Sequence, residues 1–239
     1  MTKSKAVVLH SLKYGDSQLI VEMLTEALGR LTFICRIPKT AKGKVKKQFF
    51  QPLTLLDLEF DYRPSAQMQH LRDVRVWQPY ESLPFDAVKL SVGLFVAEFL
   101  LYATRDEQQN VPLFQYVVNS LLWLDSSQGH FANFHLVFMI HLSRFIGFYP
   151  NVEDYQPGVY FDMRSGSFCT AVPSHRYFLR AAEAEKIGLL LRMDYPTMHL
   201  FAMSRTERNR CLDLILAYYR LHIDGFPELK SPSILRELF

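Results

Sequence analysis

Apolar and polar residues alternate through the first 80 positions with the two-residue period that is typical of β-strands. The clearest run is 53–62, where apolar residues alternate with acidic ones, as they do in a half-buried antiparallel strand. Weaker runs predict four further strands, at residues 6–12, 19–24, 31–35 and 68–77. Five short strands in about 75 residues indicate a small barrel. The five-stranded OB-fold fits this count and length, and an SH3-like barrel is the nearest alternative.

Farther along the chain the apolar positions take the spacing of helices. Helices are predicted over 86–104, 112–124, 131–148 and 175–191, and a short apolar segment over 229–239. Ser204 and Glu207 form a capping box, which predicts the start of a further long helix. The sequence therefore predicts an α+β chain with an OB-fold domain at 1–80 and a mainly α-helical domain at 81–239. An inserted β-hairpin is predicted near 157–172, where the helical spacing is interrupted.

Composition is that of a globular protein. The chain has 239 residues, of which 49% are hydrophobic and 21% charged, and this excludes a disordered or collagen-like chain. The longest apolar run, 92–103, is too short to cross a bilayer, which takes about 20 residues, and the N-terminal residues lack the pattern of a signal peptide. Three cysteines without a paired motif are typical of a reducing compartment. We therefore expect a cytoplasmic protein with no membrane segment.

The net charge of +3 is unevenly distributed along the chain. Residues 1–80 hold 13 Lys and Arg against 7 Asp and Glu, whereas residues 81–239 hold 14 against 17. This difference indicates a basic N-terminal module that meets a polyanion, followed by a more neutral domain. The alternative is an uneven surface charge without function.

Most of this positive charge lies in the long link between the third and fourth predicted strands. Six cations occur within twelve residues, at Arg36, Lys39, Lys42, Lys44, Lys46 and Lys47. No acidic residue occurs between Glu26 and Asp57, and aromatic residues flank the link at Phe33, Phe49 and Phe50. Cations can neutralise phosphates, and aromatic faces can stack on unpaired bases. On an OB-type barrel this combination favours nucleic-acid binding. A solvated loop stays the alternative, and Phe49 and Phe50 also fit the core.

No residue pattern in the sequence supports catalysis. The segment around Lys42-Gly43-Lys44 lacks the first Gly and the Ser or Thr of a phosphate-binding loop. Neither an HExxH zinc motif nor a GxSxG nucleophile elbow occurs. Cys169 and His175 offer two local ligands, fewer than the four that structural zinc takes. We expect no enzyme activity, no cofactor and no metal.

Several short segments stand out by their order and spacing along the whole chain. In the predicted barrel they are Ala6-Val7-Val8-Leu9-His10, Tyr14-Gly15-Asp16-Ser17, Thr25-Glu26, Gly29-Arg30-Leu31 and Gln51-Pro52-Leu53. In the helical part they are Tyr218-Tyr219-Arg220-Leu221-His222 and Leu229-Lys230-Ser231. Together these segments resemble the RecO family of bacterial DNA repair and recombination mediators. The resemblance implies an N-terminal OB-fold and a helical C-terminal domain.

The resemblance also implies a function and partners. It implies binding of single- and double-stranded DNA, strand annealing, contact with RecR and the single-stranded DNA-binding protein, and indirect help in loading RecA during gap repair. A nucleoid-associated location follows from these roles. Many relatives carry a four-Cys zinc site in the region that corresponds to 151–175, of which this chain keeps only Cys169. We expect the hairpin to close without metal.

The sequence thus predicts a non-catalytic DNA-binding mediator. The residues expected to contact DNA are Arg30, Arg36, Lys39, Lys42, Lys44, Lys46, Lys47 and Phe49. Two alternatives stay open at this point. The barrel could dock another protein in a non-catalytic interaction module, or the chain could bind RNA.

Overall fold

A computed structural model describes residues 1–38 and 45–238 of the chain. The chain divides into two compact units. The first consists of Met1–Ser126 together with Leu229–Leu235, and the second of Ser127–Glu228 together with the residues from Arg236 on. The predicted domain boundary after residue 80 is a different division of the chain, and it stays a prediction.

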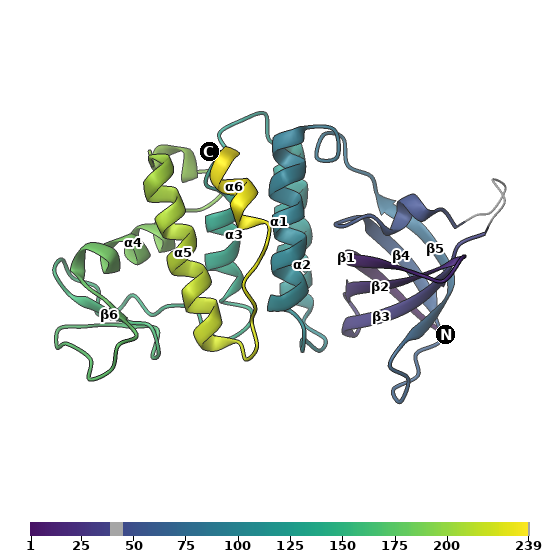
Figure 1. Ribbon diagram of the computed structural model, residues 1–239, viewed down its shortest axis with the longest axis horizontal. Helices are drawn as coiled ribbons and strands as arrows, with labels where there is room; N and C mark the ends of the chain where they lie inside the picture. The colour runs from purple at the N-terminus through teal and green to yellow at the C-terminus, as the bar shows by residue number, and fades with distance from the viewer. Residues whose placement is uncertain (39–44, 239) are drawn as a thin grey trace. The chain divides into compact units, whose positions relative to one another are not determined.

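The first unit begins with five strands that close into a barrel in the order β1-β2-β3-β5-β4 (Figure 1). The strands are β1 (Thr2–Tyr14), β2 (Gln18–Thr25), β3 (Gly29–Arg36), β4 (Leu55–Phe60) and β5 (Gln69–Gln78). All neighbouring strands are antiparallel except β3 and β5, which pair in parallel through Phe33 and Ile34. The closed five-stranded barrel confirms the predicted OB-fold.

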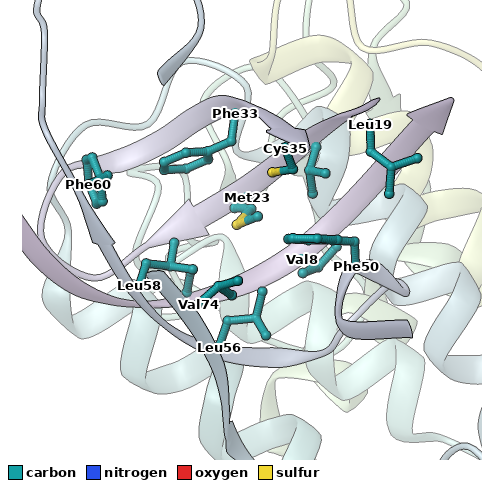
Figure 2. Close-up of a cluster of buried hydrophobic side chains, with 12 residues drawn as sticks. Val8, Leu19, Met23, Phe33, Cys35, Phe50, Leu56, Leu58, Phe60 and Val74 are labelled. Carbon is teal, nitrogen blue, oxygen red and sulfur yellow. The ribbon is translucent and has the colours of Figure 1, made fainter. Parts of the chain in front are cut away.

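Alternate residues of the five strands fill the interior of the barrel, as Figure 2 shows. Phe33 and Phe60 meet edge to face, with ring centroids 5.1 Å apart. The 3-10 helix η1 (Lys47–Phe50) comes from the basic link and was not predicted. Its last residue, Phe50, is fully buried beside Val8 in the same cluster. The end of the link is therefore anchored in the core of the barrel.

Two helices, α1 (Ala87–Ala103) and α2 (Val111–Ser126), follow the barrel in the first unit. Asp86 caps α1, because its carboxylate accepts hydrogen bonds from the first turn of the helix. The connection after α1 packs closely on the barrel at Gly29, which has a φ of +70°. A Cβ atom at Gly29 would overlap the backbone of Gln108, so only glycine fits this approach.

The segment between the barrel and α1 is held by a buried carboxylate at the end of α2. Asp125 accepts backbone hydrogen bonds from Glu81 (2.9 Å), Ser82 (2.8 Å) and Leu83 (2.6 Å). The ammonium of Lys89, which is only 4% exposed, donates to the Ser82 hydroxyl at 2.6 Å and to the Asp125 main-chain oxygen at 2.7 Å. These contacts connect both helices to the segment that leaves the barrel.

A distant segment of the chain returns to this unit. The carboxylate of Glu98 on α1 accepts the backbone N–H groups of Lys230 (2.9 Å) and Ser231 (2.8 Å), as well as the Ser231 hydroxyl. Helix α6 (Pro232–Leu238) begins directly after them. Leu229 and Leu235 are buried on either side of this start.

The second unit combines three helices with a small sheet in the order β7-β6-β8. Its elements are α3 (Phe134–Leu142), β6 (Tyr160–Asp162), β7 (Ser167–Cys169), β8 (Phe178–Leu179), α4 (Ala181–Arg192), η2 (Met198–Leu200) and α5 (Arg205–His222). The predicted capping box of α5 is present: the Ser204 hydroxyl accepts from the Glu207 N–H at 3.2 Å, and the Glu207 carboxylate accepts from the Ser204 N–H at 2.8 Å.

Two predicted helices are shorter than expected. The one predicted over 131–148 is regular only through α3 and continues in turns. The one predicted over 175–191 begins at Ala181, because the residues before it form β8 and pair with β6. Long-range pairing of Phe178 and Leu179 with the hairpin outweighs the local helical spacing.

Candidate nucleic-acid interface

The cations of the barrel fall into two groups, according to whether carboxylates pair with them. On one side of the barrel, three cations of β1 and β5 pair with carboxylates on or next to β4. Lys3 contacts Glu59 at 2.9 Å. Arg72 and Arg75 pair in the same way with Asp61 and Asp57. This side of the barrel is close to neutral and offers little attraction to a polyanion.

Other exposed cations lie near the ends of β1 and β3 and at the end of the link. Lys13 is exposed near the end of β1, and Arg36 is exposed at the end of β3. Lys46 and Lys47 are exposed where the link returns to the barrel. None of these four cations has a carboxylate partner among the residues that the structure describes. We call Lys13, Arg36, Lys46 and Lys47 the basic end of the barrel.

Strand register places Arg36 in one row with Tyr14, whereas Lys13 lies opposite the buried Leu19. Tyr14 lies opposite Gln18 on β2, and Gln18 lies opposite Arg36 on β3. Cross-strand partners share one face of a sheet. Leu19, the next residue along β2, is buried in the barrel, so this row of three points outward. The ring of Tyr14, 53% exposed, is therefore presented on the same face as Arg36.

The next outward row is apolar. Leu12, Ile20 and Ile34 lie opposite one another on the first three strands. Leu12 is 56% exposed, and the two isoleucines are half-buried. The face of strands two and three is where OB-folds bind oligonucleotides. An aromatic ring and an apolar row beside unpaired cations are the groups that hold an unstacked strand.

The link is fixed to the basic end at both sides. Ile37, near the start of the link, and Val45, near its end, both pack against the barrel core. The backbone N–H of Ile37 also donates to the Ser17 carbonyl at 2.7 Å. Phe49 is half-buried against the core and Phe50 is fully buried, so neither ring is fully available for stacking. Lys39, Lys42 and Lys44 lie outside the described residues, and their predicted DNA contacts stay predictions.

Arg30 lies apart from the other predicted contacts. It is six residues from Arg36 on β3, about 20 Å along the strand. Its side chain is 7% exposed and forms an ion pair with Glu22. Burial lowers the pKa of Arg30, and the charge of Glu22 and its hydrogen bond partly offset this. Arg36 thus lies where the link leaves the barrel and Lys46 and Lys47 where it returns, whereas Arg30 lies at the opposite end of β3.

Two site residues were missed by the sequence analysis. Lys13 and Tyr14 precede the turn at 15–17 and belong to β1, which extends beyond the predicted strand 6–12. Simple alternation from the inward Ala6 and Val8 would have placed Tyr14 inward, and the β-bulge between Val8 and His10 turns it outward. The register that sets it opposite Gln18 and Arg36 is a long-range property.

The described residues form neither a metal cluster nor a membrane-spanning helix. Within residues 1–38 and 45–238, no three His, Cys, Asp or Glu side chains gather in a way that could hold a metal ion. In the region 151–175, His175 contacts Asp162 at 3.2 Å, and Cys169 lies on β7. Among the described helices, none has both the length and the apolar character needed to cross a membrane.

The fold and these contacts define an OB-fold protein with a helical C-terminal region and a cationic end on its barrel. Comparison with known families identifies the group. Residues 1–80 match the family model of the recombination protein O N terminal domain, and residues 84–232 match that of its C terminal domain. The chain therefore belongs to the RecO family, and this membership supports a role in DNA repair and recombination.

Whole-length relatives agree with the family models. The chain is 47% identical over 239 residues to the DNA repair protein RecO of Phocaeicola vulgatus, which covers 100% of this chain and 99% of that protein. It is 48% identical over 240 residues to that of Bacteroides fragilis, with the same coverage. The protein of this name from Azobacteroides pseudotrichonymphae is 37% identical over 237 residues, 99% of this chain and 98% of that protein.

Proposed function

We propose that this chain is a non-catalytic DNA-binding mediator that holds single strands on the barrel and anneals complementary strands. The observation that carries the proposal is the basic end: four cations without carboxylate partners among the described residues, beside an outward aromatic ring on the oligonucleotide-binding face of an OB-fold. Phosphate contacts of this kind position a strand without reading its sequence, as annealing requires.

Each predicted contact within the described residues has its own place in the proposal. Arg36, Lys46 and Lys47 contact phosphates, together with Lys13. Phe49 supports the link by packing on the core rather than by stacking on a base. Arg30, paired with Glu22, acts as a positioning residue at the opposite end of β3.

The wider role follows from family membership. The proposal includes binding of double-stranded DNA, contact with RecR and the single-stranded DNA-binding protein, and indirect help in loading RecA at gaps. It places the protein in the cytoplasm at the nucleoid. No nucleotide hydrolysis is part of the mechanism, because annealing draws its free energy from base pairing.

A second function is favoured by one observation. The row of Leu12, Ile20 and Ile34 presents apolar side chains that a protein partner could cover. This would make the barrel a docking module. The two functions differ in their dependence on salt. Binding to nucleic acid releases counterions and therefore weakens as the salt concentration rises, whereas the burial of apolar side chains against a protein releases none.

The deciding experiment removes those cations of the link that lie within the described residues and measures the salt dependence of DNA binding. In the variant R36Q/K46Q/K47Q the three exposed cations become neutral. Each lost phosphate contact reduces the slope of log affinity against log salt by about 0.7 for single strands, so three contacts remove about 2. Anisotropy of a labelled oligonucleotide, measured between about 50 and 200 mM salt, gives this slope.

A matched control removes the same charge from the neutral side of the barrel. In K3Q/R72Q/R75Q the replaced cations are those paired with carboxylates. We expect little change in slope, because screening limits long-range effects beyond about 8 Å at physiological salt. Equal slopes for the native protein and R36Q/K46Q/K47Q would refute the proposed interface. A native affinity for RNA that equals its affinity for DNA would indicate RNA binding instead.

A further inference from the structure

A second stretch without acidic residues lies in the second unit. Between Asp162 and Glu183 the sequence contains Arg164, Arg176 and Arg180 but neither Asp nor Glu. This stretch includes the end of the hairpin and the strand β8. The described residues of this region form no cluster of three metal-ligating side chains.

Two of these arginines converge on one aromatic ring. The guanidinium carbon of Arg164 lies 4.8 Å from the ring centroid of Tyr177, and that of Arg176 lies 5.1 Å from it. Arg176 also donates a hydrogen bond to the Tyr177 hydroxyl at 3.1 Å. The backbone brings the three together, because the N–H of Met163 donates to the Tyr177 carbonyl at 3.0 Å.

The two guanidinium groups lack a counter-charge within residues 1–38 and 45–238. Neither Arg164 nor Arg176 forms an ion pair with a carboxylate in the described part of the chain. The nearest acid along the sequence, Asp162, contacts His175 at 3.2 Å and accepts the backbone N–H of Arg164 at 2.8 Å. The pKa of Tyr177 is lowered by the hydrogen bond from Arg176 and by the charges of both arginines.

The cluster is not needed to build the core of this unit. Both arginines are exposed and Tyr177 is half-buried, whereas the sheet is anchored by the buried Phe161 and Leu179. Cation–π contacts at exposed sites contribute only about 0.5–1 kcal/mol each, and two like charges on one ring repel each other. The arrangement is best satisfied by an anion, and the planar fork of arginine matches phosphate in particular.

We propose that Arg164, Arg176 and Tyr177 form a second DNA-phosphate site, on the second unit of the chain. This proposal rests on the proposed function in one respect: the second site holds the complementary strand while the barrel holds the first strand. The guanidinium groups bind phosphate oxygens, and Tyr177 holds both guanidinium groups in place. The site reads no sequence, because its contacts are to the DNA backbone.

The test combines two sets of substitutions in the full chain. R164Q/R176Q removes the second site, and R36Q/K46Q/K47Q removes the described cations of the link. On its own, R164Q/R176Q should leave the affinity of a short single strand within about twofold and lower the rate of annealing about tenfold. In the background of R36Q/K46Q/K47Q it should lower the remaining affinity about tenfold at 0.15 M salt and the salt slope by about 1.4, as expected for two phosphate contacts.

Two further variants control for charge and geometry. R192Q/R220Q removes two exposed arginines from the helices of the same unit and should anneal like the native protein. R164K/R176K keeps the charge without the fork and should recover most of the annealing rate. Circular dichroism and thermal unfolding check that each variant is folded.

The outcomes separate the two proposals. Native annealing by R164Q/R176Q, or a loss no larger than that of R192Q/R220Q, would overturn the second site and leave the barrel interface untouched. Full DNA affinity in R36Q/K46Q/K47Q that disappears when R164Q/R176Q is added would overturn the barrel interface and support the second site.

Discussion

Asp125 offers the sharpest test of how the first unit is held together. Its carboxylate accepts three backbone N–H groups from residues 81–83, and of these Leu83 is buried. In D125A the buried N–H loses its partner, which costs about 1–3 kcal/mol. The other two N–H groups lie where water can reach them and contribute about 1 kcal/mol each. We therefore expect D125A to lower the free energy of unfolding by about 3–5 kcal/mol.

D125N refines this prediction, because an amide keeps one acceptor oxygen. That oxygen can still serve Ser82 and Leu83, while the amide nitrogen faces the N–H of Glu81 as donor against donor. The expected loss is about 1–2 kcal/mol. Urea unfolding followed by tryptophan fluorescence measures all variants, and D106N, an exposed carboxylate in the same unit, is the matched control. It should change stability by no more than about 0.5 kcal/mol.

The difference in the free energy of unfolding between the native protein and D125N should also depend on pH. Burial acts to raise the pKa of Asp125, but the hydrogen bonds from residues 81–83 outweigh it and hold the pKa below its ordinary value. A carboxyl whose pKa is lowered in the folded state stabilises that state. This contribution is complete above the unfolded-state pKa, about 3.9, and is lost as the pH falls through the folded-state pKa. The difference should therefore be constant near neutral pH and shrink below about pH 4. A difference that stays the same down to pH 3, or a D125A loss below about 1 kcal/mol, would refute this account.

Three further predictions concern the barrel and the hairpin. F50A should lower the free energy of unfolding by about 3–5 kcal/mol, because it empties a fully buried ring position, whereas F49A should cost clearly less; urea unfolding compares them. G29A should destabilise the protein more than G15A, since both glycines have a positive φ but only at Gly29 would a Cβ atom overlap the backbone of Gln108; thermal unfolding ranks them, and equal losses would contradict the close approach. Elemental analysis after dialysis against EDTA should find no stoichiometric zinc, and about one tightly held zinc per chain would contradict the prediction.

Strands were predictable from the sequence where one face is buried and the other solvated. The alternation of Leu56, Leu58 and Phe60 with acidic residues placed β4 before any contact was known. Helix α5 was equally clear, because the capping box is a local signal. What could not be predicted depends on residues far apart in the sequence: β8 is only two residues long and exists because it pairs with β6.

The same distinction applies to the candidate site. The surplus of cations in the link can be counted in the sequence, but whether a cation is paired depends on strand register. Lys3 lies opposite Glu59, and Arg30 reaches Glu22, through pairings that no local pattern reveals. The convergence of Arg164 and Arg176 on one ring likewise depends on the pairing of β6 with the residues around β8.

The return of residues 229–235 to α1 has a consequence for the order in which the protein folds during synthesis. Glu98 leaves the ribosome long before Lys230 and Ser231, the backbone groups that it binds. At about 5–20 residues per second, translation from Ser126 to Leu235 takes about 5–20 s. During that interval the nascent first unit lacks one of its segments, so the carboxylate of Glu98 on α1 stays without these backbone partners until translation has passed residue 231. The second unit is thus synthesised while the first is still incomplete.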